Sequence, residues 1–189
     1  QMCIRDRIIV GAVGVKLYEK YSYSKETMDL SRYYGIEKEG QVPIILADVV
    51  AEEKAANIDG NDYLPLSFVQ EQLNSRFYYD MNEKLLLYTT ALDLYEIPLD
   101  STTYTVSGEA AEHTCPIFVL QDEVPYVSLS FMENFSNFIC NVYEAPHRLQ
   151  IYTENVTHQT AVIQKATAVR YQGGIKSDIL EQQLSLIHI

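Results

Sequence analysis

The sequence predicts an α+β fold that contains two related units, each made of a strand, a short helix and a β-hairpin. First, one pattern occurs twice, because Tyr-Leu-Pro-Leu-Ser-Phe at 63–68 returns 63 residues later as Tyr-Val-Ser-Leu-Ser-Phe at 126–131. A tandem unit of this size indicates a repeated supersecondary module. Second, fifteen tyrosines and six phenylalanines favour β structure. Third, each copy is followed by apolar runs separated by turn signals, which is typical of hairpins.

The composition is that of a folded protein with an acidic surface. The 189 residues suffice for one medium domain or two small ones. Hydrophobic residues make up 47% and charged residues 21%, a balance that excludes a disordered chain. The formal net charge is −12, which phosphate backbones repel, so we expect no nucleic-acid partner. Solubility is the simplest reason for the acidity.

The two ends of the chain are predicted to be foreign to the protein. Segments 1–7 and 184–189 match translations, in opposite senses, of a transposon-end adapter that is used to prepare sequencing libraries. We therefore treat both as artefacts and leave them out of the fold prediction.

The segment 8–40 is predicted to be the end of a membrane anchor or signal segment, followed by a linker. The apolar run at 8–15 is too short to cross a bilayer, which needs about 20 apolar residues. We expect it to be the tail of a truncated N-terminal anchor, and the alternative is the start of a buried strand or helix. The polar stretch at 21–40 is typical of a linker.

The first unit, predicted at 41–106, begins with an apolar strand at 42–46. Asp59-Gly60 is a turn signal that joins strands. Pro65 suits the first turn of a helix, because its missing N–H needs no partner there. That helix is expected to place on one face Leu66, Val69 and Leu73. A hairpin and two further strands are expected at 76–80, 85–90, 94–98 and 103–106.

The second unit, predicted at 107–158, repeats this order. A strand at 116–120 turns at Asp122-Glu123. Ser128 is a candidate N-cap for a short helix. The helix is expected to bury Leu129, Met132 and Phe135. A hairpin follows at 139–143 and 148–153. A last segment departs from the repeat, with two strands predicted at 160–163 and 167–171, before the Gly173-Gly174 break.

The repeated residues resemble a known family. Tyr-x-Pro-Leu-x-Phe at 63–68, Leu73, and Tyr79-Asp80 in the hairpin are similar to the copper amine oxidase N-terminal-like domain. That family commonly has Trp-Asp where this chain has Tyr79-Asp80. The second copy departs further, with Ser128 for proline and Glu144 for aspartate. The resemblance implies a tandem of small domains that, despite the family's name, carry neither copper nor a catalytic site.

The order of the segments resembles the N-terminal region of exported bacterial proteins of glycoside hydrolase family 18. In those proteins an SH3-like domain begins near a motif like Arg-Tyr-Gln-Gly-Gly-Ile-Lys-Ser at 170–177. The resemblance implies that 159–183 forms the first strands of a truncated SH3-like β-barrel. It also implies an extracellular, membrane-anchored protein at the cell surface, whose catalytic barrel lies elsewhere. The implied role is spacing that barrel or binding peptidoglycan or another cell-wall glycan. Two alternatives are a stand-alone surface protein-interaction module and a small enzyme with an unrecognised site.

No catalytic residue is predicted in this chain. Family 18 enzymes need an acid glutamate at the end of an Asp-x-x-Asp-x-Asp-x-Glu strand to protonate the leaving oxygen. The nearest look-alike starts at Asp59 and continues to Asp62, but leucines occupy its third aspartate position, Leu64, and its glutamate position, Leu66.

No metal or cofactor site is predicted either. The histidines His113, His147 and His158 lack the paired spacing of metal ligands. Cys115 and Cys140 are expected to be small buried apolar residues, and the alternative is a disulfide in an exported protein. A Cys–His nucleophilic pair is arithmetically allowed, but no local motif supports it.

Two tyrosines are the only candidates for ligand binding. On an alternating hairpin, Phe77 and Tyr79 face one way and Tyr78 the other, with Tyr88 expected near Tyr78. Exposed aromatic rings stack on sugars, so Tyr78 and Tyr88 are candidates for contact with a cell-wall glycan. The alternative is cross-strand packing that stiffens the sheet.

Overall fold

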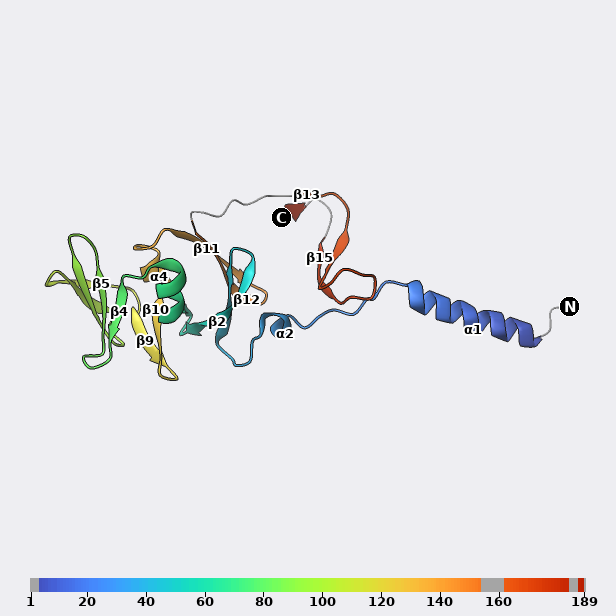
Figure 1. Cartoon of the computed structure of the whole chain (residues 1–189), viewed down its shortest axis with the longest axis horizontal. Helices are drawn as coiled ribbons and strands as arrows, with labels where there is room; N and C mark the ends of the chain where they lie inside the picture. Colours follow the sequence, from blue (N-terminus) through green and yellow to red (C-terminus); the bar gives the residue numbers. More distant parts are fainter. Residues whose placement is uncertain (1–3, 154–161, 184–186, 189) are drawn as a thin grey trace. The chain divides into compact units, whose positions relative to one another are not determined.

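Figure 1 shows a computed structural model of the chain, which describes residues 4–153, 162–183 and 187–188. The fold is α+β, as predicted, with strands forming most of the regular structure of the described residues. The chain divides into two compact units, one formed by Gln1–Tyr33 with His158–Ile189 and the other by Tyr34–Thr157.

The larger unit, Tyr34–Thr157, contains a seven-stranded sheet in the order β11-β12-β1-β2-β3-β10-β9. Every neighbouring pair is antiparallel except β1 and β12, which are parallel. The strands are β1 (Gln41–Leu46), β2 (Val49–Ile58), β3 (Asn61–Pro65), β9 (Phe118–Gln121), β10 (Val124–Ser128), β11 (Phe138–Glu144) and β12 (His147–Thr153).

A second, five-stranded antiparallel sheet follows the chain from β4 to β8. Its strands are β4 (Phe77–Asp80), β5 (Leu85–Thr89), β6 (Leu94–Pro98), β7 (Thr103–Val106) and β8 (Glu109–Glu112). The two predicted hairpins are confirmed as β4–β5 and β11–β12, and the strands predicted at 94–98 and 103–106 have the predicted bounds.

Each copy of the repeat leads from its strand directly into a short helix. In the first copy β3 ends at Pro65, and α3 (Leu66–Phe68) continues as a π-helical turn, η1 (Val69–Leu73). In the second copy α4 (Leu129–Met132) follows β10. The predicted capping by Ser128 is wrong. Its hydroxyl makes no cap bond and instead lies 2.9 Å from the Ser130 hydroxyl.

The two copies meet at the strands β3 and β10, where equivalent residues pair about a local two-fold axis. Leu64 lies opposite Val127, its own equivalent in the other copy. Tyr63 lies opposite Ser128, the equivalent of Pro65, and the reciprocal pair is Tyr126 with Pro65. The helices α3 and α4 leave this strand pair at equivalent positions. The repeated pattern therefore lies at the centre of the sheet.

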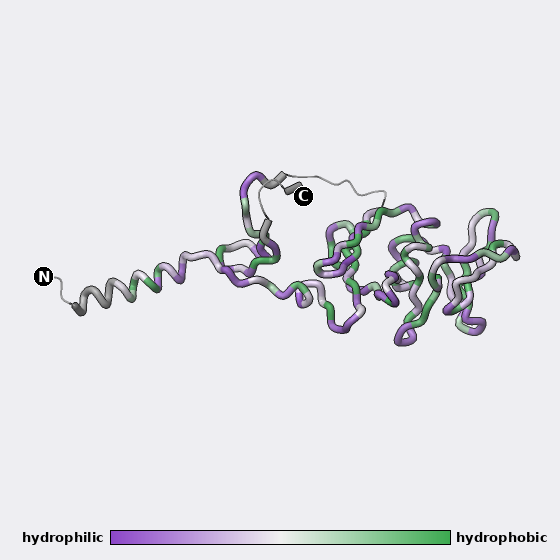
Figure 2. Tube along the Cα trace, turned by 180° about the vertical axis from the view of Figure 1, so that it is seen from behind, coloured by the Kyte–Doolittle hydropathy of each residue, from purple (hydrophilic) through white to green (hydrophobic). Residues whose placement is uncertain are grey.

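One hydrophobic cluster includes residues of both copies and of both sheets. Figure 2 shows hydrophobic and hydrophilic positions mixed along the strands of this unit, and hydrophilic positions at many of its turns. The cluster's largest fully buried side chains include Phe68 and Phe77 from the first copy and Phe118 and Phe131 from the second. The interior is thus shared between the copies.

The smaller unit contains the helix α1 (Ile4–Tyr21) and a hairpin of β14 (Thr167–Arg170) with β15 (Ile179–Gln183). In the region predicted as a linker, segment 24–28 runs beside β15, because Met28 N–H donates to the Ile179 carbonyl at 2.9 Å and Ile179 N–H donates to the Glu26 carbonyl at 2.8 Å. A short pair joins β13 (Val162–Ile163) to β16 (Ile187–His188). Residues 160–161 of the strand predicted at 160–163 lie outside the described residues.

The helix α2 (Leu30–Tyr34) ends where the larger unit begins. The apolar run at 8–15, predicted as the tail of an anchor, lies within α1. Over the described residues, no helix has both the length and the apolar character needed to cross a membrane.

Candidate functional site

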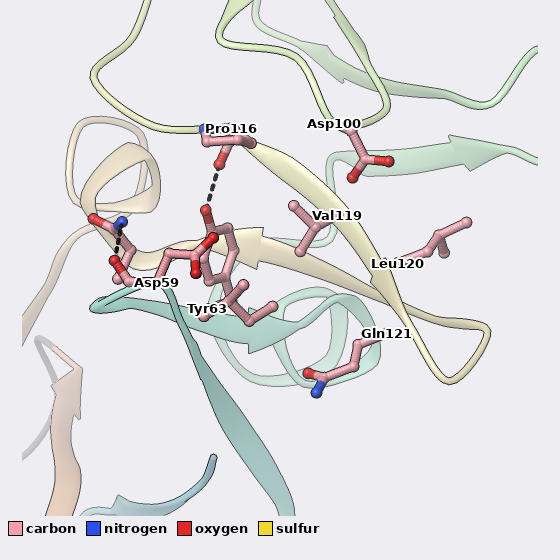
Figure 3. A pocket seen from close by; sticks show the side chains of 9 residues that line it. Asp59, Tyr63, Asp100, Pro116, Val119, Leu120 and Gln121 are labelled. Atoms are coloured by element: carbon pink, nitrogen blue, oxygen red, sulfur yellow. Dashed lines mark hydrogen bonds between the residues drawn. The ribbon is translucent and has the colours of Figure 1, made fainter.

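A cleft of about 330 Å³ lies beside the turn between β2 and β3 (Figure 3). It is lined by that turn, by β9 and by the loop that carries Asp100, and thus by parts of both sheet-forming regions of the larger unit. The lining residues are Ile58, Asp59, Asn61, Tyr63, Asp100, Pro116, Val119, Leu120 and Gln121. We call this the first cleft.

The turn that forms one wall requires an unusual backbone. Asp59 and Gly60 both have positive φ, at 50° and 80°. Two successive positive φ angles are typical of the type I′ turn that joins the strands of a tight hairpin, and aspartate and glycine are favoured there. The side-chain amide Nδ2 of Asn61 donates to the Asp59 carbonyl at 3.4 Å. The Asp-Gly turn signal thus has the predicted structure.

Tyr63 forms an inner wall of the first cleft. Its hydroxyl donates to the Pro116 carbonyl at 2.9 Å, which links β3 to the segment before β9 (Figure 3). Burial, and after it the neighbouring thiol of Cys115, raises the pKa of this phenol above its usual range, and the charges of Asp59 and Asp100 add to the effect. The raised pKa favours the protonated phenol, which is the form that donates this hydrogen bond.

The chemistry of the first cleft is acidic on its rim and mixed on its walls. Asp59 and Asp100 are exposed, and in the described part of the chain neither carboxylate has a hydrogen-bond or ion-pair partner. Figure 3 shows Asp59 beside the Tyr63 ring and Asp100 on the far side of the cleft, next to Val119. The lining also includes three apolar residues, Pro116, Val119 and Leu120. The arrangement attracts cations and offers apolar contact.

A second cleft, of about 240 Å³, lies at the equivalent turn of the other copy. Asp122 and Glu123 have φ of 51° and 65°, the same turn geometry as Asp59 and Gly60. Tyr126, the equivalent of Tyr63, is again part of the lining. Here the acid is paired, because the Lys38 ammonium lies 3.1 Å from the Asp122 carboxylate. The repeat thus produces two related clefts, which we call the first and the second.

The two predicted ligand-binding tyrosines are not brought together. Tyr78 is 62% exposed and projects from β4. Tyr88 is only 4% exposed, and its ring stacks on Phe77 with centroids 4.4 Å apart. Phe77 and Tyr88 are cross-strand partners, so Tyr88 shares the buried face of Phe77 and Tyr78 lies on the other face. The ring of Tyr88 contributes to cross-strand packing, which was the alternative interpretation.

A group of small polar side chains surrounds Cys115. Its Sγ lies 3.6 Å from Nδ1 of His113 and 3.5 Å from the Ser128 hydroxyl. The thiol is buried, at 5% exposure, beneath the partly buried His113. Cys115 and Cys140 are both free thiols, so the disulfide that had been the alternative does not form. Cys115 is a buried small residue, as expected, whereas Cys140 is only partly buried.

A second polar group links distant strands of the large sheet. His147 Nε2 lies 2.8 Å from Asp62 Oδ1, and its Nδ1 lies 3.3 Å from Glu144 Oε2. Asn57 also donates to Asp62, at 2.8 Å. In strand order β1 and β2 lie between β12 and β3, so this contact requires a strongly curled sheet. The His147–Asp62 contact thus joins β12 to β3 across the curled sheet.

No metal centre is found within the described residues, since no three or more His, Cys, Asp or Glu side chains gather as ligands there. His113 and His147 lie in the two separate polar groups described above. His158 lies outside the described residues.

Sequence reasoning missed the first cleft. The local signal was present, because Asp59-Gly60 precedes the repeated Tyr63 and Asp122-Glu123 precedes Tyr126 at the same spacing. The opposite wall is placed by the pairing of β3 with β10, which are far apart in the sequence, and β10 in turn pairs with β9. No family model, curated protein or solved structure matches this chain.

Proposed function

We propose that this chain is a non-catalytic cell-envelope module that spaces a partner domain or binds peptidoglycan. The observation that supports it most directly is where the repeated residues lie. Leu64, Leu66 and Phe68 are buried, as are their equivalents Val127, Leu129 and Phe131. The side chains that define the repeat thus serve packing, which is what a scaffold or binding module requires.

The finer architecture is part of this proposal. We propose two related strand–helix–hairpin modules of the copper amine oxidase N-terminal-like type, at 41–106 and 107–158. Their support is the equivalent course of β2 to β5 and of β9 to β12 along the chain. We further propose that β14 and β15 are the first strands of an SH3-like domain, on the resemblance of 170–177.

The proposed setting is the cell surface of a bacterium, in an exported, membrane-anchored protein of glycoside hydrolase family 18. The joint order of the paired repeat and the motif at 170–177 supports it. In this setting the module either holds the catalytic barrel away from the membrane or adds affinity for the glycan.

Two measurements test the proposed function together. The purified chain is incubated with peptidoglycan and with chitin oligomers. We expect that it either binds to the peptidoglycan or leaves it unbound, and that it hydrolyses neither glycan. Hydrolysis that is lost in Asp59→Asn or Asp100→Asn would show an enzyme and contradict the proposal. The uninterrupted reading frame is also recovered, and a frame without an Asp-x-x-Asp-x-Asp-x-Glu strand contradicts the family 18 assignment. Capture of envelope proteins in place of peptidoglycan would favour a protein-interaction module.

A further inference from the structure

We propose that the first cleft binds a primary ammonium group on its ligand, against Asp59 and Asp100, in the way that the second cleft holds the ammonium of Lys38 against Asp122. This proposal goes beyond the proposed function and does not depend on it. It rests on the internal two-fold relation between the clefts.

The first step is the equivalence of the two carboxylates. Asp59 and Asp122 occupy the same position in the two repeats, 63 residues apart, and each is the first residue of a turn with two positive φ angles. Each turn joins a hairpin that ends in the central strand pair β3–β10. The local two-fold that relates Leu64 to Val127 therefore relates the two carboxylates as well.

The second step is what stands opposite each carboxylate. The second cleft is closed by the segment 38–41, which bonds to β2 through Asn57 N–H and the Gly40 carbonyl at 2.8 Å. The first cleft is closed by Asp100, whose N–H donates to the Phe118 carbonyl of β9 at 2.8 Å. Where one cleft has a lysine to neutralise its aspartate, the other has a second aspartate.

The third step is the negative charge of the first cleft. Asp59 and Asp100 line the first cleft without a cationic partner among the described residues. After burial and the Cys115 thiol, their charges add to the raised pKa of Tyr63. A cation in the first cleft is attracted by both carboxylates, whereas the second cleft already contains the ammonium group of Lys38. The Lys38–Asp122 pair is 69% and 76% exposed, so its counterpart with a ligand is expected to be weak. The ammonium group thus gives selectivity more than affinity.

The fourth step is the remainder of the ligand. Pro116, Val119 and Leu120 offer apolar contact, and the amides of Asn61 and Gln121 offer hydrogen bonds. A volume of about 330 Å³ admits one sugar ring or one lysine side chain. An amino sugar with a free amine and a peptide lysine share the required chemistry, and the experiment distinguishes them.

The test is a titration followed by amide chemical shifts of the full chain. The probes are glucosamine and Nα-acetyl-lysine methylamide, and N-acetylglucosamine is the uncharged match for the first. We expect saturable shifts at 59–61, 100 and 119–121 with one or both ammonium probes, and no saturable shifts there with N-acetylglucosamine. The probe with the higher affinity identifies the source of the amine. Equal binding of N-acetylglucosamine, or no binding of either ammonium probe, overturns the proposal.

Four variants sharpen the test. Asp59→Asn and Asp100→Asn each weaken binding by about two- to fivefold, and asparagine suits the positive φ of Asp59, so the fold is retained. Asp122→Asn is the matched control, because it makes the same charge change at the equivalent turn, and it leaves the first cleft's affinity unchanged. Lys38→Gln is expected to add a second set of shifts at 122–126. Unchanged affinity in both first-cleft variants, or no second set in Lys38→Gln, contradicts the inference.

Discussion

At the scale of single residues, burial and nearby charge set the chemistry of Cys140 and His147. Burial, and then the negative charges of Glu133 and Asp62, raise the pKa of the Cys140 thiol to about 12. For His147, burial alone would lower the pKa, but the hydrogen bond and charge of Asp62, followed by those of Glu144, outweigh it and raise the pKa. Cys140 lies in β11 and His147 in β12, and Asp62 of β3 affects the pKa of both. The pKa of each residue therefore tests whether the sheet curls to bring β3 near β11 and β12.

Cys140 is expected to resist alkylation in the folded protein. With a pKa of about 12, only about one thiol in ten thousand is ionised at pH 8, and the thiolate is the reactive form. Iodoacetamide labelling followed by peptide mass spectrometry, with and without urea, measures the rate at this one cysteine. Equal rates in the folded and the unfolded chain would show that Cys140 is neither buried nor near these acids.

His147 is expected to make stability depend on pH near neutrality. Because its folded pKa is raised, protonated His147 contributes stability that is fully present below the unfolded pKa of about 6.5. That contribution is lost as the pH rises through the folded pKa. The free energy of unfolding of the wild type should therefore exceed that of His147→Gln by about 0.5–1 kcal/mol at pH 6, and the difference should shrink by pH 9. Urea titrations at the two pH values measure it, and His113→Gln serves as the control. A difference that grows with pH would contradict the assigned sign.

At the scale of elements, the hairpins β4–β5 and β11–β12 were predictable, whereas strands such as β2 and β8 were not. Strands β4 to β7 were predicted because apolar alternation and turn signals fall close together there. Strand β2 was missed because Ala-Glu-Glu-Lys-Ala-Ala at 51–56 has the composition of a helix, as has Glu-Ala-Ala-Glu at 109–112 in β8. Pairing with neighbouring strands overrides that preference.

The site was less predictable than the elements. The positions of Tyr78 and Tyr88 followed from strand alternation only after the register of β4 and β5 was known, since Phe77 lies opposite Tyr88. Likewise the parallel pairing of β1 with β12 joins segments about a hundred residues apart, and no local pattern indicates it.

The two faces of the β4–β5 hairpin are expected to differ sharply in their contribution to stability. Phe77 is 1% exposed and stacked on Tyr88, so Phe77→Ala should cost about 3–5 kcal/mol of unfolding free energy. Tyr78 lies on the exposed face, and Tyr78→Ala should change it by less than about 0.5 kcal/mol. Urea unfolding followed by circular dichroism measures both. Similar losses in the two variants would mean that the hairpin faces are assigned the wrong way round.

At the scale of the whole larger unit, the two copies are expected to unfold together. They supply neighbouring strands to the same sheet and side chains to the same cluster, so neither copy has an interior of its own. This is the central claim, because a shared interior explains why the two copies keep the same packing positions and why their turns form two related clefts. The exposed residues that line the two clefts, such as Asp100 and Lys38, can then differ while the shared hydrophobic cluster stays the same.

The most direct test is native-state hydrogen exchange at β3 and β10 in the variants Phe68→Ala and Phe131→Ala. Each phenylalanine is 1% exposed, and the two come from different copies. We predict that either substitution accelerates exchange at Leu64 and Val127 alike, by the factor that corresponds to its loss of global stability. Acceleration confined to the copy that carries the substitution would show two independent cores and contradict this account.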